Sequence, residues 1–323
     1  MLRRPRRNRR TDAIRGLNRE TRLSVENLVY PLFIIPGENK REEIVSMPGI
    51  ARMTIDLMLE EIAECMALDL KSFILFPAVP DELKDKVATY GSQDDNFYLE
   101  ALRQAKARFP EACLITDVAM DPYSSDGHDG LVEDGQILND ETLPILGEMA
   151  VAQARAGADI IGPSDMMDGR IAHIRESLDE AGFSTVGIMS YTAKYASAFY
   201  GPFREALDST PKFGDKKTYQ MDPANRSEAF IEAELDVQEG ADFMMVKPAL
   251  PYLDVIRLLK DNFDLPIAAY NVSGEYAMLM AAHEKGWLDG PAVMRESVLA
   301  IRRAGADVII TYFAKTLAKE MKG

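Results

Sequence analysis

A short phrase that recurs three times constrains the fold of this chain more than any other feature. Gly, Ala and Asp followed by an apolar run occur in AGADIIGPSD (156–165), EGADFMMVKP (239–248) and AGADVIITYF (304–313). Each phrase follows a segment with helical periodicity, and a Gly at that point supplies the left-handed cap that ends a helix. The uninterrupted apolar run that follows is typical of a strand buried on both faces. Repeated helix-to-strand units predict parallel strands.

Apolar runs of this kind number eight along the chain, and segments with helical periodicity lie between them. One such helix is predicted to begin at a Thr54 N-cap and to bury Ile55, Leu59, Ile62 and Met66. Eight strands alternating with helices predict an α/β fold, a (β/α)8 TIM barrel. A doubly wound open sheet is the alternative, and the absence of a GxGxxG turn after the first run disfavours it. The predicted strands are residues 28–35, 71–78, 112–119, 158–165, 184–191, 241–248, 266–273 and 306–313.

Two segments exceed what a barrel needs, and they define the predicted domain organisation. Residues 1–25 precede the first strand and are expected to form an N-terminal arm, with the barrel catalytic domain at 26–323. Residues 195–223 form a long connection after the fifth strand that is rich in Gly, Pro, aromatic and basic residues. Loops longer than about 12–15 residues are uncommon and usually functional. We therefore expect 195–223 to be an active-site lid.

The charge of the chain is unevenly distributed. The net charge is −15, which makes general binding to nucleic acid or to a membrane surface unfavourable. Six of the first ten residues are arginines, so the rest of the chain is more acidic still. This basic end is consistent with a frayed terminus, a nucleic-acid arm, a transit peptide or an arm that lies on an acidic neighbouring subunit. The opposite charge of the remaining chain favours the subunit arm among the functional interpretations.

The cysteine content and the hydropathy of the chain indicate the cellular compartment in which it works. Only Cys65 and Cys113 are present, which excludes a disulfide framework and an all-cysteine zinc site. No apolar run approaches the roughly 20 residues that span a bilayer, and no signal-peptide core is present. We expect a soluble, cytoplasmic protein.

Two lysines at the ends of adjacent predicted strands are the sharpest chemical feature. Lys247 ends the sixth strand, and Lys194 follows the fifth by three residues. In a barrel, catalytic groups lie at the carboxyl ends of the strands. Burial and the repulsion between two ammonium groups both lower a lysine pKa and supply a neutral amine, which forms imines with ketones. The alternative is that the lysines pair separately with Asp117 and Asp165 or extend to solvent.

The loop 117–130 is a candidate cation site. Asp117, Asp121, Asp126 and Asp129 offer hard oxygen ligands, which suit Mg²⁺ better than zinc, and His128 is the only imidazole there. A surface loop with Asx turns is an equally good interpretation of the same residues.

Several of these segments together resemble one enzyme family, porphobilinogen synthase, also called 5-aminolevulinate dehydratase. The resemblance covers essentially the whole chain and implies a lyase that condenses two 5-aminolevulinate molecules into porphobilinogen with loss of two waters. This is an early step of tetrapyrrole (heme, chlorophyll) biosynthesis. The matching segments are GPSDMMDGR (162–170), TAKYASAFYGPFR (192–204), KTYQMDPANR (217–226), MVKPALPYLD (245–254), NVSGEYAM (271–278) and TYFAK (311–315).

The resemblance implies a role for each matching residue. The two lysines correspond to the residues that bind the two substrates as Schiff bases. Two lid residues correspond to the clamp on one substrate's carboxylate, and two more residues to the groups that bind the other carboxylate. In that order, the residues are Lys194 and Lys247, Arg204 and Lys216, and Ser273 and Tyr312.

The resemblance also bears on metals. Zinc-dependent relatives carry three cysteines where this chain has Ala119, Asp121 and Asp129, so no catalytic zinc is expected. The chain is similar to the magnesium-responsive, aspartate-containing bacterial type, and Glu232 corresponds to the ligand of an allosteric Mg²⁺. Whether Asp121 and Asp129 bind a cation is left open. Lys216 stands where relatives often have Arg, which keeps the charge and loses the bidentate fork.

Family members assemble as homo-octamers whose arms wrap neighbouring barrels, so the resemblance implies self-association of this chain. Two other functions fit part of the pattern. A class I aldolase needs only one catalytic lysine, so the second lysine and the basic lid disfavour it. A non-catalytic assembly subunit would be expected to lose a lysine or Arg204, and none is lost.

Overall fold

The eight predicted strands form a closed parallel barrel in the computed structural model, which describes residues 1–207, 212 and 214–322. Each strand pairs with the next one in the chain, and β1 pairs with β12 to close the ring. The (β/α)8 architecture predicted from the repeated phrase is therefore confirmed. The barrel strands are β1 (Leu28–Ile34), β4 (Ser72–Pro77), β5 (Cys113–Ile115), β8 (Ile160–Ile161), β9 (Gly187–Lys194), β10 (Phe243–Lys247), β11 (Ile267–Asn271) and β12 (Val308–Thr311).

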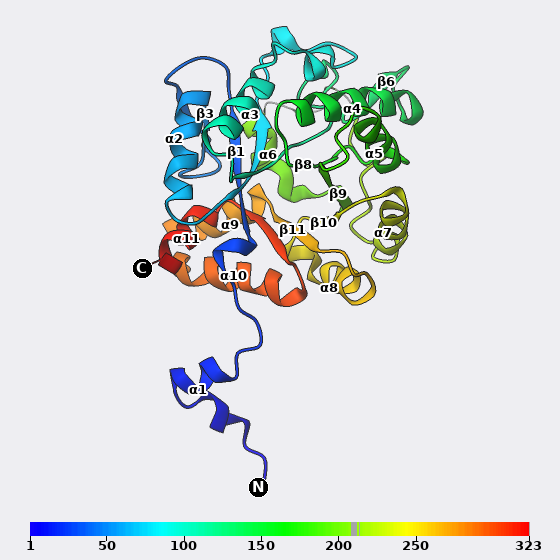
Figure 1. The fold of residues 1–323 in the computed structure, drawn as a ribbon. Helices are drawn as coiled ribbons and strands as arrows, with labels where there is room; N and C mark the ends of the chain where they lie inside the picture. Colours follow the sequence, from blue (N-terminus) through cyan, green and yellow to red (C-terminus); the bar gives the residue numbers. More distant parts are fainter. Residues whose placement is uncertain (208–211, 213, 323) are drawn as a thin grey trace.

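Helices cover the outside of the barrel (Figure 1). The first of them has Thr54 at its N-cap, as predicted, but its buried face is Met58, Leu59, Ile62 and Cys65, while the predicted Ile55 and Met66 are only half-buried. The long helices are α2 (Ile55–Met66), α3 (Phe97–Arg108), α4 (Asn139–Arg155), α5 (Arg170–Glu180), α7 (Glu228–Glu239), α8 (Leu253–Asn262), α9 (Ser273–Glu284), α10 (Gly290–Ala304) and α11 (Ala314–Lys322).

The recurring Gly-Ala-Asp phrase links three pairs of neighbouring barrel strands at the amino-terminal end of the barrel. The glycines end their helices with positive φ, +106° at Gly157, +101° at Gly240 and +127° at Gly305. Each aspartate carboxylate then accepts a backbone N–H from the preceding strand of the barrel. The N–H donors are Leu114 to Asp159 at 2.8 Å, Ile188 to Asp242 at 2.8 Å, and Ile267 to Asp307 at 3.1 Å. The phrase thus joins a helix stop to a strand-pairing contact.

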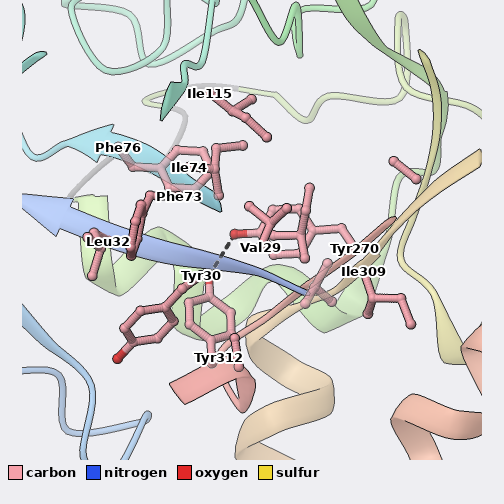
Figure 2. Close-up of a cluster of buried hydrophobic side chains, with 14 of the residues drawn as sticks. Val29, Tyr30, Leu32, Phe73, Ile74, Phe76, Ile115, Tyr270, Ile309 and Tyr312 are labelled. Carbon is pink, nitrogen blue, oxygen red and sulfur yellow. Dashed lines mark hydrogen bonds between the residues drawn. The ribbon is translucent and has the colours of Figure 1, made fainter. Parts of the chain in front are cut away.

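Aromatic rings fill the barrel near its carboxyl-terminal end (Figure 2). Phe33 lies 6.0 Å from Tyr312 between ring centroids, and Phe76 lies 6.3 Å from Tyr270. The hydroxyls of Tyr270 and Tyr312 share a hydrogen bond of 3.0 Å, drawn in Figure 2. These four rings therefore form an apolar layer inside the barrel that contains two phenol hydroxyls.

The N-terminal segment stands away from the barrel (Figure 1). It contains the 3-10 helix η1 (Pro5–Arg9) and the helix α1 (Asp12–Leu17), neither of which buries a residue against this chain. The 3-10 helix η2 (Val25–Asn27) then leads into β1.

The predicted lid, 195–223, is partly helical. It begins with the 3-10 helix η5 (Ala198–Tyr200), capped by Ser197, whose hydroxyl accepts the Phe199 N–H at 3.1 Å, and continues as α6 (Gly201–Leu207). Residues 208–211 and 213, which include Pro211 of the predicted lid, lie outside the described residues. At its far end the Met221 N–H donates to the Lys194 carbonyl at 3.0 Å, so both ends of the segment lie at the barrel mouth.

Smaller elements complete the chain. β3 (Ala51–Met53) pairs in parallel with β1, and β2 (Arg41–Glu43) pairs antiparallel with β3. A hairpin of β6 (Leu131–Glu133) and β7 (Gln136–Leu138) follows β5, and short 3-10 helices lie at η3 (Asp81–Leu83), η4 (Thr89–Ser92) and η6 (Leu250–Tyr252). In the part of the chain that the structure describes, every helix is too short or too polar to cross a bilayer.

Candidate active site

The two predicted lysines lie side by side at the mouth of the barrel. Lys194 is the last residue of β9 and Lys247 the last of β10, and the two are paired in register. Each is only 5% exposed. The sequence places Lys194 three residues beyond its predicted strand, 184–191, whereas pairing with β10 extends β9 to Lys194.

Aromatic rings surround the Lys247 ammonium on several sides. The ring centroids lie 5.1 Å away at Tyr191, 5.3 Å at Tyr200, 4.8 Å at Phe203 and 4.8 Å at Tyr270. Among the described residues, no carboxylate oxygen comes within 4.0 Å of its Nζ. Burial, followed by the charge of Lys194, lowers the pKa of Lys247 to about 7. A large share of this amine is therefore neutral and nucleophilic near neutral pH.

Lys194 has polar surroundings instead. Its ammonium donates a hydrogen bond to the Ser164 carbonyl and lies 3.6 Å from Asp129 Oδ2. The lysines do not pair with Asp117 or Asp165, which was the alternative considered from the sequence. Asp165 instead faces Arg170 at 3.9 Å. Two lysines on adjacent strand ends thus have different environments, one mainly aromatic and one carboxylate-lined.

Asp117 lies close to both lysines. It is 7% exposed, and its Oδ1 is buried without a hydrogen-bond partner among the described residues. Burial raises the pKa of Asp117, while the charges of Lys247 and Lys194 oppose that rise. A carboxyl group with a raised pKa beside two amines can exchange protons with them.

A lysine ammonium occupies the centre of the predicted cation loop. Lys216 Nζ lies 3.1 Å from Asp121 Oδ2 and 2.9 Å from Asp129 Oδ1. Burial and the charge of Asp129 raise the pKa of Asp121 to about 7. Burial acts in the same direction on Asp129, but Lys194 and Lys216 outweigh it and hold the pKa of that carboxyl below its usual range.

The other members of the loop do not join this group. The Asp126 carbonyl accepts the Lys212 N–H at 3.2 Å, and His128 Nδ1 contacts the Tyr219 hydroxyl at 3.0 Å. Within the described ranges, no three His, Cys, Asp or Glu side chains come together as a metal site. The carboxylates of Asp121 and Asp129 both pair with Lys216, and Asp129 also faces Lys194.

The lysines and the basic lid residues share one small cavity of about 30 Å³. Sequence reasoning selected Lys194, Lys247, Arg204, Lys216 and Asp121, and the structure brings all five together. Sequence reasoning did not select Tyr200, Phe203 and Gln220, although all three lie inside the predicted lid and in the segments that resemble the family, 192–204 and 217–226. The cavity is lined by Asp121, Lys194, Tyr200, Phe203, Arg204, Lys216, Gln220 and Lys247.

Ser273 and Tyr312 lie on the Lys247 side of the mouth. Both were expected within strands, but β11 ends at Asn271 and β12 at Thr311, so both follow their strands. The Ser273 hydroxyl accepts the Phe203 N–H of the lid helix at 3.0 Å. Tyr312 reaches the same region through its hydrogen bond with Tyr270, a ring that contacts Lys247.

Glu232 lies outside this site, on helix α7 in the outer layer (Figure 1). Burial raises the pKa of Glu232 to about 7, Arg170 opposes this shift, and Asp236 and Asp168 add to it. Arg170 also faces Asp236 at 3.6 Å. The structure therefore separates Glu232 from the lysines and surrounds it with other carboxylates and one arginine.

Three kinds of comparison with known proteins identify the same enzyme family. The family model for delta-aminolevulinic acid dehydratase matches residues 2–320. Enzymes of that name from Bradyrhizobium diazoefficiens and Chlamydia pneumoniae are both 52% identical to this chain, over 99% and 97% of it and over 91% and 95% of their own lengths. A crystal structure of delta-aminolevulinic acid dehydratase (porphobilinogen synthase) from Toxoplasma gondii, in complex with the reaction product porphobilinogen, has a TM-score of 0.97. It is 50% identical and covers 99% of this chain and 92% of its own.

Proposed function

This chain belongs to the delta-aminolevulinic acid dehydratase family, and from that premise we propose that it condenses two molecules of 5-aminolevulinate into porphobilinogen with loss of two waters. The reaction is that of a hydro-lyase early in tetrapyrrole biosynthesis. The observation that carries the proposal for this chain is the in-register pair Lys194 and Lys247 at one barrel mouth.

Lys247 is the proposed nucleophile for the first imine, since its pKa is lowered to about 7. Its neutral Nζ attacks the ketone carbon of one substrate, and the resulting carbinolamine loses water to form an imine. The aromatic rings around it exclude solvent, which disfavours hydrolysis of that imine. Lys194 forms the second imine on the polar side, where Asp117 can exchange protons and the ionised Asp129 can stabilise positive charge. Both lysines are regenerated when the two substrates join.

Two pairs of residues bind the substrate carboxylates. Arg204 and Lys216 line the cavity beside Lys194, which supports their role as the clamp on one substrate. Ser273 and Tyr312 lie beyond the aromatic rings of Lys247, which supports their binding the other. Charge-assisted hydrogen bonds of this kind are stronger than neutral ones.

Magnesium is the metal that the residues favour. Mg²⁺ commonly binds one or two carboxylates and keeps several waters, so Glu232 with Asp168 and Asp236 nearby fits it. A bound cation would add positive charge to that of Arg170 beside these carboxylates. Zinc at the mouth is disfavoured, because Ala119, Asp121 and Asp129 offer no thiolate and Lys216 already pairs with both aspartates. Titration calorimetry with Mg²⁺ should lose its signal in Glu232→Ala, and stimulation should disappear while basal turnover remains.

We further propose self-association, up to the homo-octamer, through the N-terminal segment. Its support is that η1 and α1 bury nothing against their own chain while carrying arginines that an acidic surface would attract. A cytoplasmic location stays a prediction from the sequence.

Borohydride trapping tests the proposed chemistry directly. The protein is incubated with 5-aminolevulinate and borohydride, and the modified residues are mapped by mass spectrometry. Adducts at Lys247 and Lys194 are expected, and Lys194→Ala should still trap one substrate at Lys247 while making no porphobilinogen. The absence of an adduct at both lysines, or near-normal synthesis by Lys194→Ala, would overturn the proposal.

A further inference from the structure

Glu275 is a fully buried carboxylate that the proposed chemistry does not use. It is the third residue of α9, it is 0% exposed, and it does not line the cavity. Its two oxygens accept four hydrogen bonds from N–H groups, which is close to the full capacity of a carboxylate. The donors are Leu250 N at 2.7 Å, Ala249 N at 3.4 Å, Val272 N at 2.7 Å and Asn271 Nδ2 at 3.1 Å.

These donors come from two different strand ends. Ala249 and Leu250 form the turn that follows Lys247, whereas Asn271 and Val272 lead from β11 into Ser273. Asn271 extends the network further, because its Oδ1 accepts the Thr311 hydroxyl at 2.9 Å. One carboxylate thus connects the chain just beyond Lys247 to the chain just before Ser273, and indirectly to the residue before Tyr312.

We propose that Glu275 is a positioning residue for the reaction, holding Lys247 and Ser273 at a fixed separation so that one substrate's ketone and carboxylate are bound in register. The inference rests on the proposed function of Lys247 and Ser273. A helix N-cap requires only the bond to Val272. The additional bonds to Ala249 and Leu250, on a different element, are what a purely local capping role leaves unexplained.

Glu275→Gln tests the charge and geometry at constant size. The amide nitrogen cannot accept, so it faces N–H donors and at least one backbone group loses its partner. A shift of reacting groups by about 1 Å can cost about 100-fold in rate. We therefore expect borohydride trapping at Lys247 to slow by about 10–100-fold at saturating substrate.

Asp307→Asn is the matched control. Asp307 also accepts a backbone N–H between neighbouring barrel strands, from Ile267 at 3.1 Å, but at the opposite end of β11, and it pairs with Lys260 at 2.7 Å and Arg302 at 3.4 Å as well. Melting temperatures are measured for both variants, and trapping is compared at temperatures equally far below each transition. The control should trap at Lys247 within about twofold of the unmodified protein, because the change lies far from the mouth.

The outcomes of these measurements separate the positioning role of Glu275 from the proposed function. Slow trapping in Glu275→Gln but not in Asp307→Asn supports the inference. If Glu275→Gln traps substrate at the rate of the unmodified protein, or if both variants are slowed equally, the inference is overturned while the proposed function stays intact. No trapping at Lys247 in the unmodified protein overturns both. If Glu275→Gln does not fold, Thr311→Val, which removes the bond to Asn271 and the bond that the Thr311 hydroxyl accepts from the Phe313 N–H at 3.2 Å, must show a smaller slowing at Lys247 or the inference fails.

Discussion

The reactivity of Lys247 follows from two neighbouring features rather than from the residue itself. Four aromatic rings remove water from its ammonium, and the ammonium of Lys194 adds like-charge repulsion. Burial is the larger effect, and both lower the pKa. Asp117, Asp121 and Asp129 act in the opposite direction and limit the shift.

We predict that imine formation at Lys247 rises as pH increases through about 7, the pKa of this amine. The rate of imine formation rises with pH because the neutral amine is the nucleophile and predominates above the pKa. In Lys194→Met the repulsion is lost, so the pKa should rise and the inflection should move to higher pH. The measurement is the initial rate of borohydride-trapped adduct against pH.

Lys217→Met is the control for that experiment, since Lys217 lies on the lid segment with its side chain 74% exposed. Its profile should match that of the unmodified protein. An inflection near 10.4, the ordinary value for lysine, would contradict the assigned environment.

The lid segment and the start of α9 fit together closely. A Cβ on Gly274 would lie 2.4 Å from the Phe199 carbonyl oxygen and 2.8 Å from its Cα. Only glycine allows η5 to approach α9 this closely, with Ser273 holding the Phe203 N–H beside it. The contact brings Tyr200 and Phe203 over Lys247.

Gly274→Ala should therefore displace the lid rather than only strain the helix. We expect a loss of about 1–3 kcal/mol in the free energy of unfolding and a fall of about 10–100-fold in kcat/KM, since Lys247 loses its cover. Gly201→Ala, which lies in the lid segment with open space around its Cβ position, should change both by little. Steady-state kinetics and denaturant unfolding measure the pair. Equal effects in the two variants would show that the close contact is unimportant.

Lys216 links the lid segment to the loop after β5. The sequence suggests a simple substrate clamp, for which Lys216→Ala would cost about 10–100-fold in affinity. Its ion pairs with Asp121 and Asp129 predict a stability cost as well. Removing one partner of a buried ion pair costs about 3–5 kcal/mol, so the variant should unfold at clearly lower denaturant concentration.

The stability loss in Lys216→Ala should depend on pH. The folded pKa of Asp121 is already raised to about 7, above the unfolded value of about 3.9, so protonation favours the folded state and stability declines as pH rises between them. Without Lys216 this effect grows, and the variant should be weakest near pH 8. Asp121→Asn in the same chain should restore part of the loss. A loss that is independent of pH would contradict the pairing.

The whole chain combines an acidic barrel with a basic N-terminal segment whose η1 and α1 bury no residue. Deleting residues 1–25 should shift the assembly to smaller species in analytical ultracentrifugation, since η1 and α1 bury nothing and the segment packs against its own barrel near its end, at Leu23 and Val25. High salt should act in the same direction, because exposed charges more than about 10 Å apart are screened at 0.1 M. An unchanged sedimentation profile after the deletion would favour a frayed terminus.

The barrel could be predicted from the sequence because its signals are local. A Gly that ends a helix, an Asp and an apolar run lie within ten residues of one another, and this combination recurs in three of the helix-to-strand units. The two lysines could be assigned to one mouth because parallel strands end at the same face. Recognition of the family rested on segments spread along the chain, which the comparisons confirm.

Only the tertiary structure decided how these residues meet. The register that extends β9 to Lys194, the rings from β9, β11 and the lid around Lys247, and the position of Lys216 between two aspartates all depend on residues far apart in sequence. The same is true of Glu275, whose four donors come from two strand ends. Periodicity reports which face of an element is buried, whereas burial, charge and hydrogen bonding at the mouth arise from the packing of several elements at once.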